Sequence, residues 1–392
     1  MADNIKSVIG KVFNDIADAI ETGQFGDKVR VGITSLGSEL GVDNIVRGAE
    51  IAQARDASME VVLIGPKVDS KLTQVIAETE DEAYSKMEEM LDKGEIGSCV
   101  TMHYNFPIGV STVGRVSTPG KGNEMFIATT TGTTAVHRVE AMIKNGINGI
   151  IAAKAMGIEN PSLGILNLDG ARQVERAFKD LVEKGYKVNF VESSRADGGI
   201  VMRGNDLLLG TPDIMITDTL TGNVLMKVFS SYTTGGSFES QGYGYGPGIG
   251  EDYERVVLIL SRASGSPVVA NAISYGANLV RGNVSKIAKE EFEKAHKAGL
   301  RDILDKLTSE EKKTQEAEEV VAPPSETVTA TIEGIDIMEL EDAVQALWRK
   351  GVYAESGMGC TGPIVMVNEG KLSQAFDILG EAGYEVDRPE DC

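Results

Sequence analysis

Cys360 occupies an unusual position, because the residues around it are almost all small. It lies in the segment GMGCTGP, residues 357–363, between two short runs with strand character. A packing cysteine needs apolar neighbours, whereas small neighbours leave a thiol accessible and backbone N–H groups free to face a thiolate or an oxyanion. A catalytic thiol usually needs a basic helper, yet no histidine follows His296. The residues alone leave two interpretations open: a reactive thiol, or a hairpin tip with an incidental cysteine.

The chain has two further cysteines, Cys99 and Cys392. Cys99 precedes His103 by four residues in a stretch that we predict to be a strand. Four strand residues span about 13 Å, so a Cys–His pair is disfavoured and a buried or half-buried thiol is expected. Cys392 is the last residue of the sequence. Three scattered cysteines form neither a disulfide framework nor a CxxC metal motif.

Polar turns after predicted strands form a second set of candidates. Residues 213–217 read as a buried strand, residues 218–223 as a polar turn, and residues 224–229 as the start of a helix. Anions bind at such turns, where the carboxyl end of a parallel strand leads into a helix amino terminus. An ordinary helix cap is the alternative. The candidate phosphate- or acyl-binding residues are Asn167, which follows another strand, and Thr219, Thr221, Gly222 and Asn223.

Similar turns occur at residues 35–42, 129–134 and 167–170. If all four turns lie at strand ends of one sheet, they should line one cleft with amide and hydroxyl groups. Such a cleft would suit phosphate or an acyl phosphate better than a bulky apolar ligand.

Composition excludes several classes of function. The net charge of −21 argues against nucleic acid or an anionic membrane as a partner. No apolar run approaches the roughly 20 residues of a membrane span, and the acidic amino-terminal segment reads as an amphipathic helix and not as a signal peptide. The three histidines are scattered, so we expect no transition-metal site. We expect a cytoplasmic protein with free thiols.

Alternating strand and helix patterns predict the fold class. The stretch from Val29 to Pro66 reads as strand, glycine-rich turn, helix and strand, and the pattern recurs through residue 305. Such alternation is typical of an α/β fold with a parallel sheet between helices. In residues 171–185 the helical face is clear, with a glycine at the carboxyl end. The segment FESQGYGYGPGIGEDYERV, residues 238–256, instead reads as a long irregular loop that is either mobile over the cleft or simply exposed.

The composition changes near residue 306. Residues 306–330 are charged and then contain Pro-Pro, which is typical of a solvated linker. Residues 331–392, here called the C-terminal module, have their own strand and helix pattern and carry Cys360. We therefore predict an α/β domain at 1–305, a linker at 306–330 and a small α+β module at 331–392. A tethered thiol suggests a carrier that visits more than one place.

Two groups of motifs resemble known families. The segments SLGILNLDG and RGNDLLLGTPDIMITDTLTGNVLMKV resemble the phosphate acyltransferases of phospholipid synthesis, over roughly residues 161–232. The segments DIADAIETGQFG, RVGITSLGSELG and AESGMGCTGP are similar to the alpha subunits of component C of glycine/sarcosine/betaine reductase complexes. This second resemblance spans nearly the whole chain. The cysteine loop is its most specific mark, since the phospholipid-synthesis enzymes lack the appended module.

The resemblance implies a fold and an activity. The fold would be a three-layer, parallel-sheet, phosphate-acyltransferase-like core with a small C-terminal α+β module. Component C of the family converts a carboxymethyl selenoether on the selenoprotein component A to an acetyl thioester, and releases acetyl phosphate with inorganic phosphate. The family's cysteine maps onto Cys360. The implied partners are component A and a condensing-enzyme-like beta subunit in a hetero-oligomer, with phosphate as substrate and no cofactor.

Two other functions fit the same residues. A direct phosphate acyltransferase that uses acyl carrier protein or coenzyme A would keep forming acyl phosphate after Cys360→Ala. A non-catalytic scaffold subunit would form no acyl adduct on any cysteine, and Cys360→Ser would leave turnover unchanged.

Overall fold

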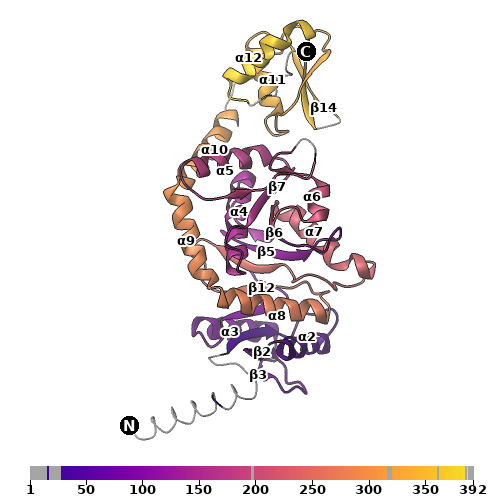
Figure 1. Ribbon diagram of the computed structural model, residues 1–392, viewed down its shortest axis with the longest axis vertical. Coiled ribbons are helices and arrows are strands. Elements are labelled where there is room, and N and C mark those ends of the chain that lie inside the picture. The colour runs from indigo at the N-terminus through magenta and orange to yellow at the C-terminus, as the bar shows by residue number, and fades with distance from the viewer. Residues whose placement is uncertain are drawn as a thin grey trace.

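The computed structural model describes Ile16 and residues 28–195, 198–315, 320–359, 362–384 and 386, with the backbone alone for residues 308–315 and 358. The predicted amino-terminal helix therefore lies mostly outside the described residues. Figure 1 shows an elongated molecule in which a large α/β body carries the C-terminal module at one end. No helix within the described ranges combines the length and the apolar character needed to cross a membrane.

The body is built on one large sheet. Its strand order is β3-β2-β1-β4-β12-β11-β5-β6-β10-β7-β8, with β9 paired to β7. The described strands are β1 (Val29–Thr34), β2 (Met59–Gly65), β3 (Thr73–Ile76), β4 (Ser98–Thr101), β5 (Val110–Ser117), β6 (Glu124–Thr133), β7 (Ser162–Leu166), β8 (Asn189–Phe190), β9 (Val201–Met202), β10 (Ile214–Ile216), β11 (Gly246–Gly250) and β12 (Val257–Ile259).

The middle of the sheet reverses direction three times. The pairs β12–β11, β11–β5 and β5–β6 are antiparallel. The other described pairs of this sheet are parallel. An odd number of antiparallel pairs separates β12 from β6, so the strands on the two sides of this region run in opposite directions. Their carboxyl ends therefore lie at opposite edges of the sheet. We call the edge where β6, β7 and β10 end the Gly170 edge, and the edge where β1, β4 and β12 end the Ser264 edge.

Helices cover both faces of this sheet, which confirms the predicted α/β class (Figure 1). One core joins the sheet to α2, α4, α5, α8 and α9, and a second core joins the other face to α3, α6 and α7. The described helices of the body are α2 (Val42–Arg55), α3 (Glu80–Asp92), α4 (Arg138–Ala155), α5 (Ala171–Glu183), α6 (Gly204–Leu209), α7 (Thr219–Ser231), α8 (Ser266–Arg281), α9 (Val284–Lys297) and α10 (Leu300–Gln315), with a 3₁₀ turn at Tyr232–Thr234.

The amphipathic pattern of α5 accounts for its place in the first core. Val174, Ala177, Phe178 and Leu181 recur at helical spacing and are all buried. Burying a large side chain of this kind contributes about 1.5–3 kcal/mol each, which exceeds the intrinsic helix preference of any one residue. The helix ends before Gly185, whose φ of 98° is left-handed, as the sequence predicts.

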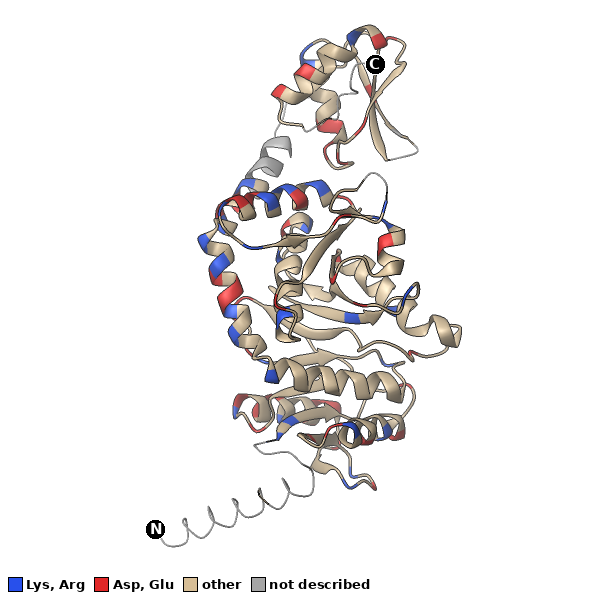
Figure 2. Ribbon diagram, viewed as in Figure 1, with Lys and Arg blue, Asp and Glu red and all other residues tan. Residues whose placement is uncertain are grey.

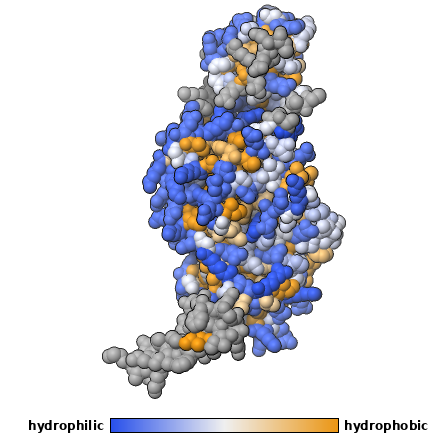
Figure 3. All heavy atoms as spheres, viewed as in Figure 1, coloured by the Kyte–Doolittle hydropathy of each residue, from blue (hydrophilic) through white to orange (hydrophobic). Residues whose placement is uncertain are grey.

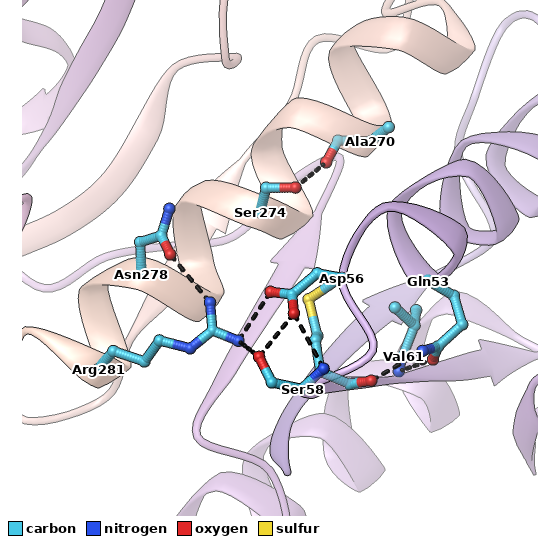
Figure 4. A network of polar contacts seen from close by, with 9 residues as sticks. Gln53, Asp56, Ser58, Val61, Ala270, Ser274, Asn278 and Arg281 are labelled. Atoms are coloured by element: carbon cyan, nitrogen blue, oxygen red, sulfur yellow. Dashed lines mark hydrogen bonds and ion pairs between the residues drawn. The ribbon is translucent and has the colours of Figure 1, made fainter. Parts of the chain in front are cut away.

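Polar contacts fix α2 and α8 at one end of their shared surface (Figure 4). The Arg281 guanidinium of α8 donates to Asp56 Oδ2 at 2.8 Å and to Ser58 Oγ at 2.6 Å, in the turn that joins α2 to β2. Burial raises the pKa of Asp56, but hydrogen bonds from Ser58 and Arg281 outweigh it and lower that pKa overall. Helix α8, late in the sequence, is thereby joined to the first β-α-β unit, which consists of β1, α2 and β2.

Residues 246–250 form a buried strand and not part of a long loop, so the predicted loop at 238–256 is wrong over this range. The sequence Gly-Pro-Gly-Ile-Gly has low strand propensity, yet β11 lies between β12 and β5. A Cβ added at Gly246 would lie 1.9 Å from Val113 O, and one added at Gly248 would lie 2.3 Å from the Phe106 ring. Close packing on its neighbours therefore accounts for the glycines.

The C-terminal module has a separate three-stranded antiparallel sheet with the order β13-β15-β14. Two helices cover it and a separate core joins them. Helix α10 continues to Gln315, beyond residue 306 where we predict the linker to begin. The elements of the module are β13 (Ala330–Ile332), α11 (Leu340–Arg349), β14 (Ala354–Met358), β15 (Pro363–Val367) and α12 (Leu372–Glu381), with a 3₁₀ turn at Glu369–Lys371.

Candidate functional site

Cys360 and Thr361 lie outside the described residues, as does Cys392. The chain on either side of Cys360 is described. Met358 pairs with Pro363, and the Gly359 N–H donates to Gly362 O at 2.8 Å. Strands β14 and β15 are therefore paired up to the last described residue on each side of positions 360 and 361. The predicted strands flanking the cysteine are confirmed, and the reactivity of its thiol stays a prediction.

The turn after β10 is the first turn of a helix. Helix α7 begins at Thr219, five residues before the predicted start at Val224, and Asp218 caps it by accepting from the Thr221 N–H at 2.7 Å. Thr219 Oγ1 donates to Gly132 O at 3.2 Å, and Asn223 Nδ2 donates to Thr130 O at 3.0 Å. Both side-chain donors thus hold α7 against β6.

Gly222 has a packing role in the same contact. A Cβ at this position would lie 1.7 Å from Thr129 O and 2.7 Å from Thr217 Oγ1. The glycine is thus required for the close approach of α7 to β6, whether or not a ligand binds nearby. The Thr221 hydroxyl, by contrast, has no hydrogen-bond partner among the described residues.

Arg138 joins two of the strand-end turns. This first residue of α4 forms ion pairs with Asp169 Oδ2 at 3.2 Å and with Asp218 Oδ2 at 2.7 Å. Asp169 follows β7 and Asp218 follows β10, so the turns after β6, β7 and β10 meet at the Gly170 edge. Asn167 is exposed at this edge, and its side chain has no partner within the described ranges.

We did not identify Arg138 from the sequence. The available signal was an arginine just after the threonine-rich turn, combined with an aspartate just after each of two strands. Arg138 contacts these two aspartates only because β6, β10 and β7 are neighbours in the sheet, and a single sequence does not reveal the strand order.

The fourth polar turn, residues 35–42, follows β1 and therefore lies at the Ser264 edge. The prediction that all four turns line one cleft is wrong, because the three strand reversals send β1 and β6 to opposite edges. The residues of this turn connect instead to the loop after β12, where the Glu39 N–H donates to Arg262 O at 2.9 Å.

A second polar cluster lies at the Ser264 edge. Glu239 is buried, and its Oε2 accepts from Ser264 Oγ at 3.0 Å. Burial raises the pKa of Glu239, against the opposing effects of Ser261, Ser264 and the Lys227 charge. Lys227 Nζ lies 5.7 Å from the centre of the Tyr245 ring.

This cluster combines a carboxyl group of raised pKa with a cation. Hydrogen bonding to Tyr245 raises the pKa of Lys227, so its ammonium form is favoured. In such a pair the carboxyl group can exchange a proton and the ammonium group can attract an anion. We did not single out Glu239, because it sits in a segment that reads as an irregular loop.

Cys99 and the histidines have other roles. Cys99 is fully buried in β4, and burial raises the pKa of its thiol far above the usual range. The expected buried thiol is confirmed. His137 Nδ1 accepts from the Glu140 N–H and caps α4, and His296 pairs with Glu251 at 2.7 Å. Within the described ranges, no group of three or more His, Cys, Asp or Glu residues could hold a metal ion.

Comparisons with known proteins identify the family. Residues 29–366 match the family model described as "Fatty acid synthesis protein". The chain is 65% identical over 380 residues to the glycine/sarcosine/betaine reductase complex component C subunit alpha of Peptoclostridium acidaminophilum, which covers 97% of this chain and 99% of that protein. It is 26% identical over 238 residues to the phosphate acyltransferase of Thermotoga petrophila, covering 51% of this chain and 67% of that one.

Among solved structures, a branched-chain phosphotransacylase from Enterococcus faecalis V583 aligns with a TM-score of 0.45 and 14% identity, covering 64% of this chain and 99% of that one. The match to the component C alpha subunit carries the assignment, because it extends over almost the full length of both proteins. The chain belongs to the family of glycine/sarcosine/betaine reductase component C alpha subunits, which is related to the phosphate acyltransferases.

Proposed function

We propose that this chain carries an acetyl group as a thioester on Cys360 and transfers it to inorganic phosphate. The observation that carries the proposal is the 65% identity, over 97% of the chain, to a component C alpha subunit. The relationship to phosphate acyltransferases supports a transfer of an acyl group between sulfur and phosphate. The pairing of β14 with β15, which flank Cys360 in the sequence, supports the presentation of a thiol between two strands.

The proposed step is a phosphorolysis. A phosphate oxygen attacks the acetyl carbonyl carbon, the C–S bond breaks, and the sulfur leaves as the Cys360 thiolate, which then takes up a proton. The products are acetyl phosphate and the free thiol, so no electrons are gained or lost. Phosphate is already an anion at neutral pH, and a thiolate leaves readily, so the step needs positioning and oxyanion stabilisation more than a histidine base.

The upstream partners belong to the same proposal. The acetyl group would come from a carboxymethyl selenoether on a selenoprotein component A. This conversion replaces a C–Se bond by a C–H bond, a two-electron reduction in which the departing selenium is oxidised. A condensing-enzyme-like beta subunit would complete component C. The name of the relative, a subunit of a complex component, supports a hetero-oligomer. The net charge of −21 disfavours nucleic acid or an anionic membrane as a partner, and a cytoplasmic location fits the proposal.

Phosphate has two candidate positions. At the Gly170 edge, the side chains of Asn167 and Thr221 form no hydrogen bond with any described residue. Thr219, Gly222 and Asn223 instead hold α7 against β6. At the Ser264 edge, Lys227 offers a charge beside Glu239. We propose the Gly170 edge, because the turns after three strands meet there, and we take the Ser264 edge as the alternative.

The test is mass spectrometry of the complex after incubation with acetyl phosphate in phosphate-free buffer. We expect an acetyl adduct on the peptide that contains Cys360 and its loss when phosphate or arsenate is added. Cys360→Ser should abolish the adduct, and Cys99→Ser is the matched control because Cys99 is buried. If Cys360→Ala still forms acetyl phosphate without an adduct, the direct acyltransferase is correct. Normal turnover in Cys360→Ser with no adduct on any cysteine would establish the scaffold.

Phosphate kinetics separate the two edges. If phosphate binds at the Gly170 edge, Thr221→Ala and Asn167→Ala should each raise the KM for phosphate by about tenfold, the usual effect of losing one hydrogen bond to an anion. Lys227→Ala should then leave this KM unchanged. The opposite pattern would place phosphate at the Ser264 edge.

A further inference from the structure

Asp336 joins the C-terminal module to the body of the protein. It lies between β13 and α11, and only 6% of its surface is exposed. Its Oδ1 accepts from the Gly170 N–H at 3.3 Å, and its Oδ2 accepts from the Arg172 N–H at 3.2 Å. The same Oδ1 also accepts from the Met338 N–H at 2.9 Å in its own turn. A carboxylate of the module is therefore bound at the amino terminus of α5.

Helix α5 lacks a cap of its own at this end. Its N-cap residue is Gly170, which has no side chain to accept from the first turn, and its first turn contains no acidic residue. The free N–H groups and the helix dipole at an amino terminus favour a negative charge. Asp336 supplies the hydrogen-bond acceptor and the negative charge that the first turn of α5 lacks.

Glu339 makes the second contact, one turn further along α5. It forms an ion pair with Arg176, and its Oε1 accepts from Gln173 Nε2 at 3.2 Å. Two acidic side chains of the module thus meet the amino terminus and a basic residue of the same helix. Figure 2 shows charged residues of both signs along α5, on the side of the body that faces the module.

The contact is polar. The buried apolar residues of the module form a core that is separate from both cores of the body. A cavity of about 600 Å³ lies beside the contact, with both Arg138 and Asp342 in its lining. The outer surface over α9, on the left in Figure 3, is mainly hydrophilic. Polar interfaces between domains permit relative motion, so this docking should be reversible.

We propose that Asp336 and Glu339 form an acidic latch that holds the C-terminal module on α5 and releases it as a unit. The latch sets the position of strands β14 and β15, which flank Cys360 in the sequence. Its relevance to acetyl transfer rests on the function proposed above, but its existence does not. Because charge complementarity carries the contact, added salt should weaken it.

Asp336→Asn is the sharpest test. The remaining amide oxygen can still accept from Met338 and keep the turn of the module, while an NH₂ group replaces the oxygen that accepts from Arg172. Hydrogen–deuterium exchange of peptides covering residues 168–176 should become about tenfold faster, because hydrogen bonds to charged groups commonly contribute at least that factor. The radius of gyration from small-angle X-ray scattering should increase. Trp348, the single tryptophan, reports whether the module remains folded.

Two controls make the result specific. Glu369→Gln removes the same charge from an exposed position of the module, and it should change neither measurement. Arg176→Glu and Glu339→Arg should each loosen the docking, and the double variant should restore it. The latch is rejected if Asp336→Asn leaves both exchange and scattering unchanged, or if Glu369→Gln has the same effect. Neither measurement requires the thiol or phosphate, so the result is independent of the proposed function and should be the same in Cys360→Ser.

Discussion

The contact between α7 and β6 can be tested by replacing Gly222 with alanine. The added Cβ would lie 1.7 Å from Thr129 O, a backbone atom that cannot rotate away. Ordinary contact begins at 3.4 Å, so α7 would have to retreat by about 1.7 Å, the difference between these distances. The hydrogen bonds from Thr219 and Asn223 to β6, now 3.2 and 3.0 Å long, would then be broken.

The cost follows from these losses. Two hydrogen bonds contribute about 1 kcal/mol each, and overpacking a close contact costs about 1–3 kcal/mol. The free energy of unfolding of the body should therefore fall by about 3–5 kcal/mol, which is a large share of the roughly 5–15 kcal/mol of a typical domain. Any loss of activity in this variant would follow from displacement of α7.

Denaturant unfolding measures this effect with two probes. Far-UV circular dichroism follows the whole chain, whose helices lie mainly in the body, and Trp348 fluorescence follows the C-terminal module alone. We expect Gly222→Ala to shift the dichroism transition to lower denaturant and to leave the Trp348 transition in place. A shift of both would mean that the module depends on the body for its stability.

Gly204→Ala is the matched control. Gly204 also lies in a helix of the body, but a Cβ there would have no neighbour within 4 Å. Its replacement should change the free energy of unfolding by less than about 1 kcal/mol. An unchanged dichroism midpoint in Gly222→Ala would refute the described packing of α7, and equal shifts in the two variants would show that the close contact has no special cost.

Two further predictions concern Asp206 and Cys99. Burial opposes ionisation of Asp206, but hydrogen bonds from the Arg203 N–H, Ser193 and Ser194 outweigh it and lower its pKa to about 2. Asp206→Asn should therefore destabilise the protein by about 2 kcal/mol at neutral pH. The stabilisation from the native carboxylate is present above pH 3.8 and is lost as the pH falls through about 2. The thermal midpoints of the native protein and Asp206→Asn should therefore converge near pH 2. A difference between these midpoints that does not change with pH would contradict this. Cys99 is fully buried with a raised pKa, so iodoacetamide should label its peptide at least about 100-fold faster in urea than in native buffer, and equal rates would show that β4 is accessible.

Local patterns in the sequence predict much of the body. The apolar face of α5 is visible in its helical spacing, and the buried strand around Cys99 follows from its composition. Both features depend on residues close in the chain. The hairpin around Cys360 is also predictable, because two strand-like runs are separated by a short run of small residues.

Features that depend on distant contacts were missed. β11 has a sequence typical of a loop, and only its position between β12 and β5 makes it a strand. Arg138 meets Asp169 and Asp218 because β6, β10 and β7 are neighbours in the sheet. Asp336 likewise caps a helix whose first turn lies 164 residues earlier in the sequence. Local propensity carries no information on such pairings, which tertiary packing decides.

The strand order also constrains how the chain can fold during synthesis. Strand β4 ends at residue 101, but its neighbour β12 begins only at residue 257. While residues 102–256 leave the ribosome, the first four strands have an open edge beside β4 and lack the helix α8 that covers α2. Unpaired edges of this kind promote intermolecular strand pairing, and long-range pairing is slow. A nascent chain stopped before residue 257 should therefore recruit chaperones or aggregate, whereas one that has released α8 should be protected.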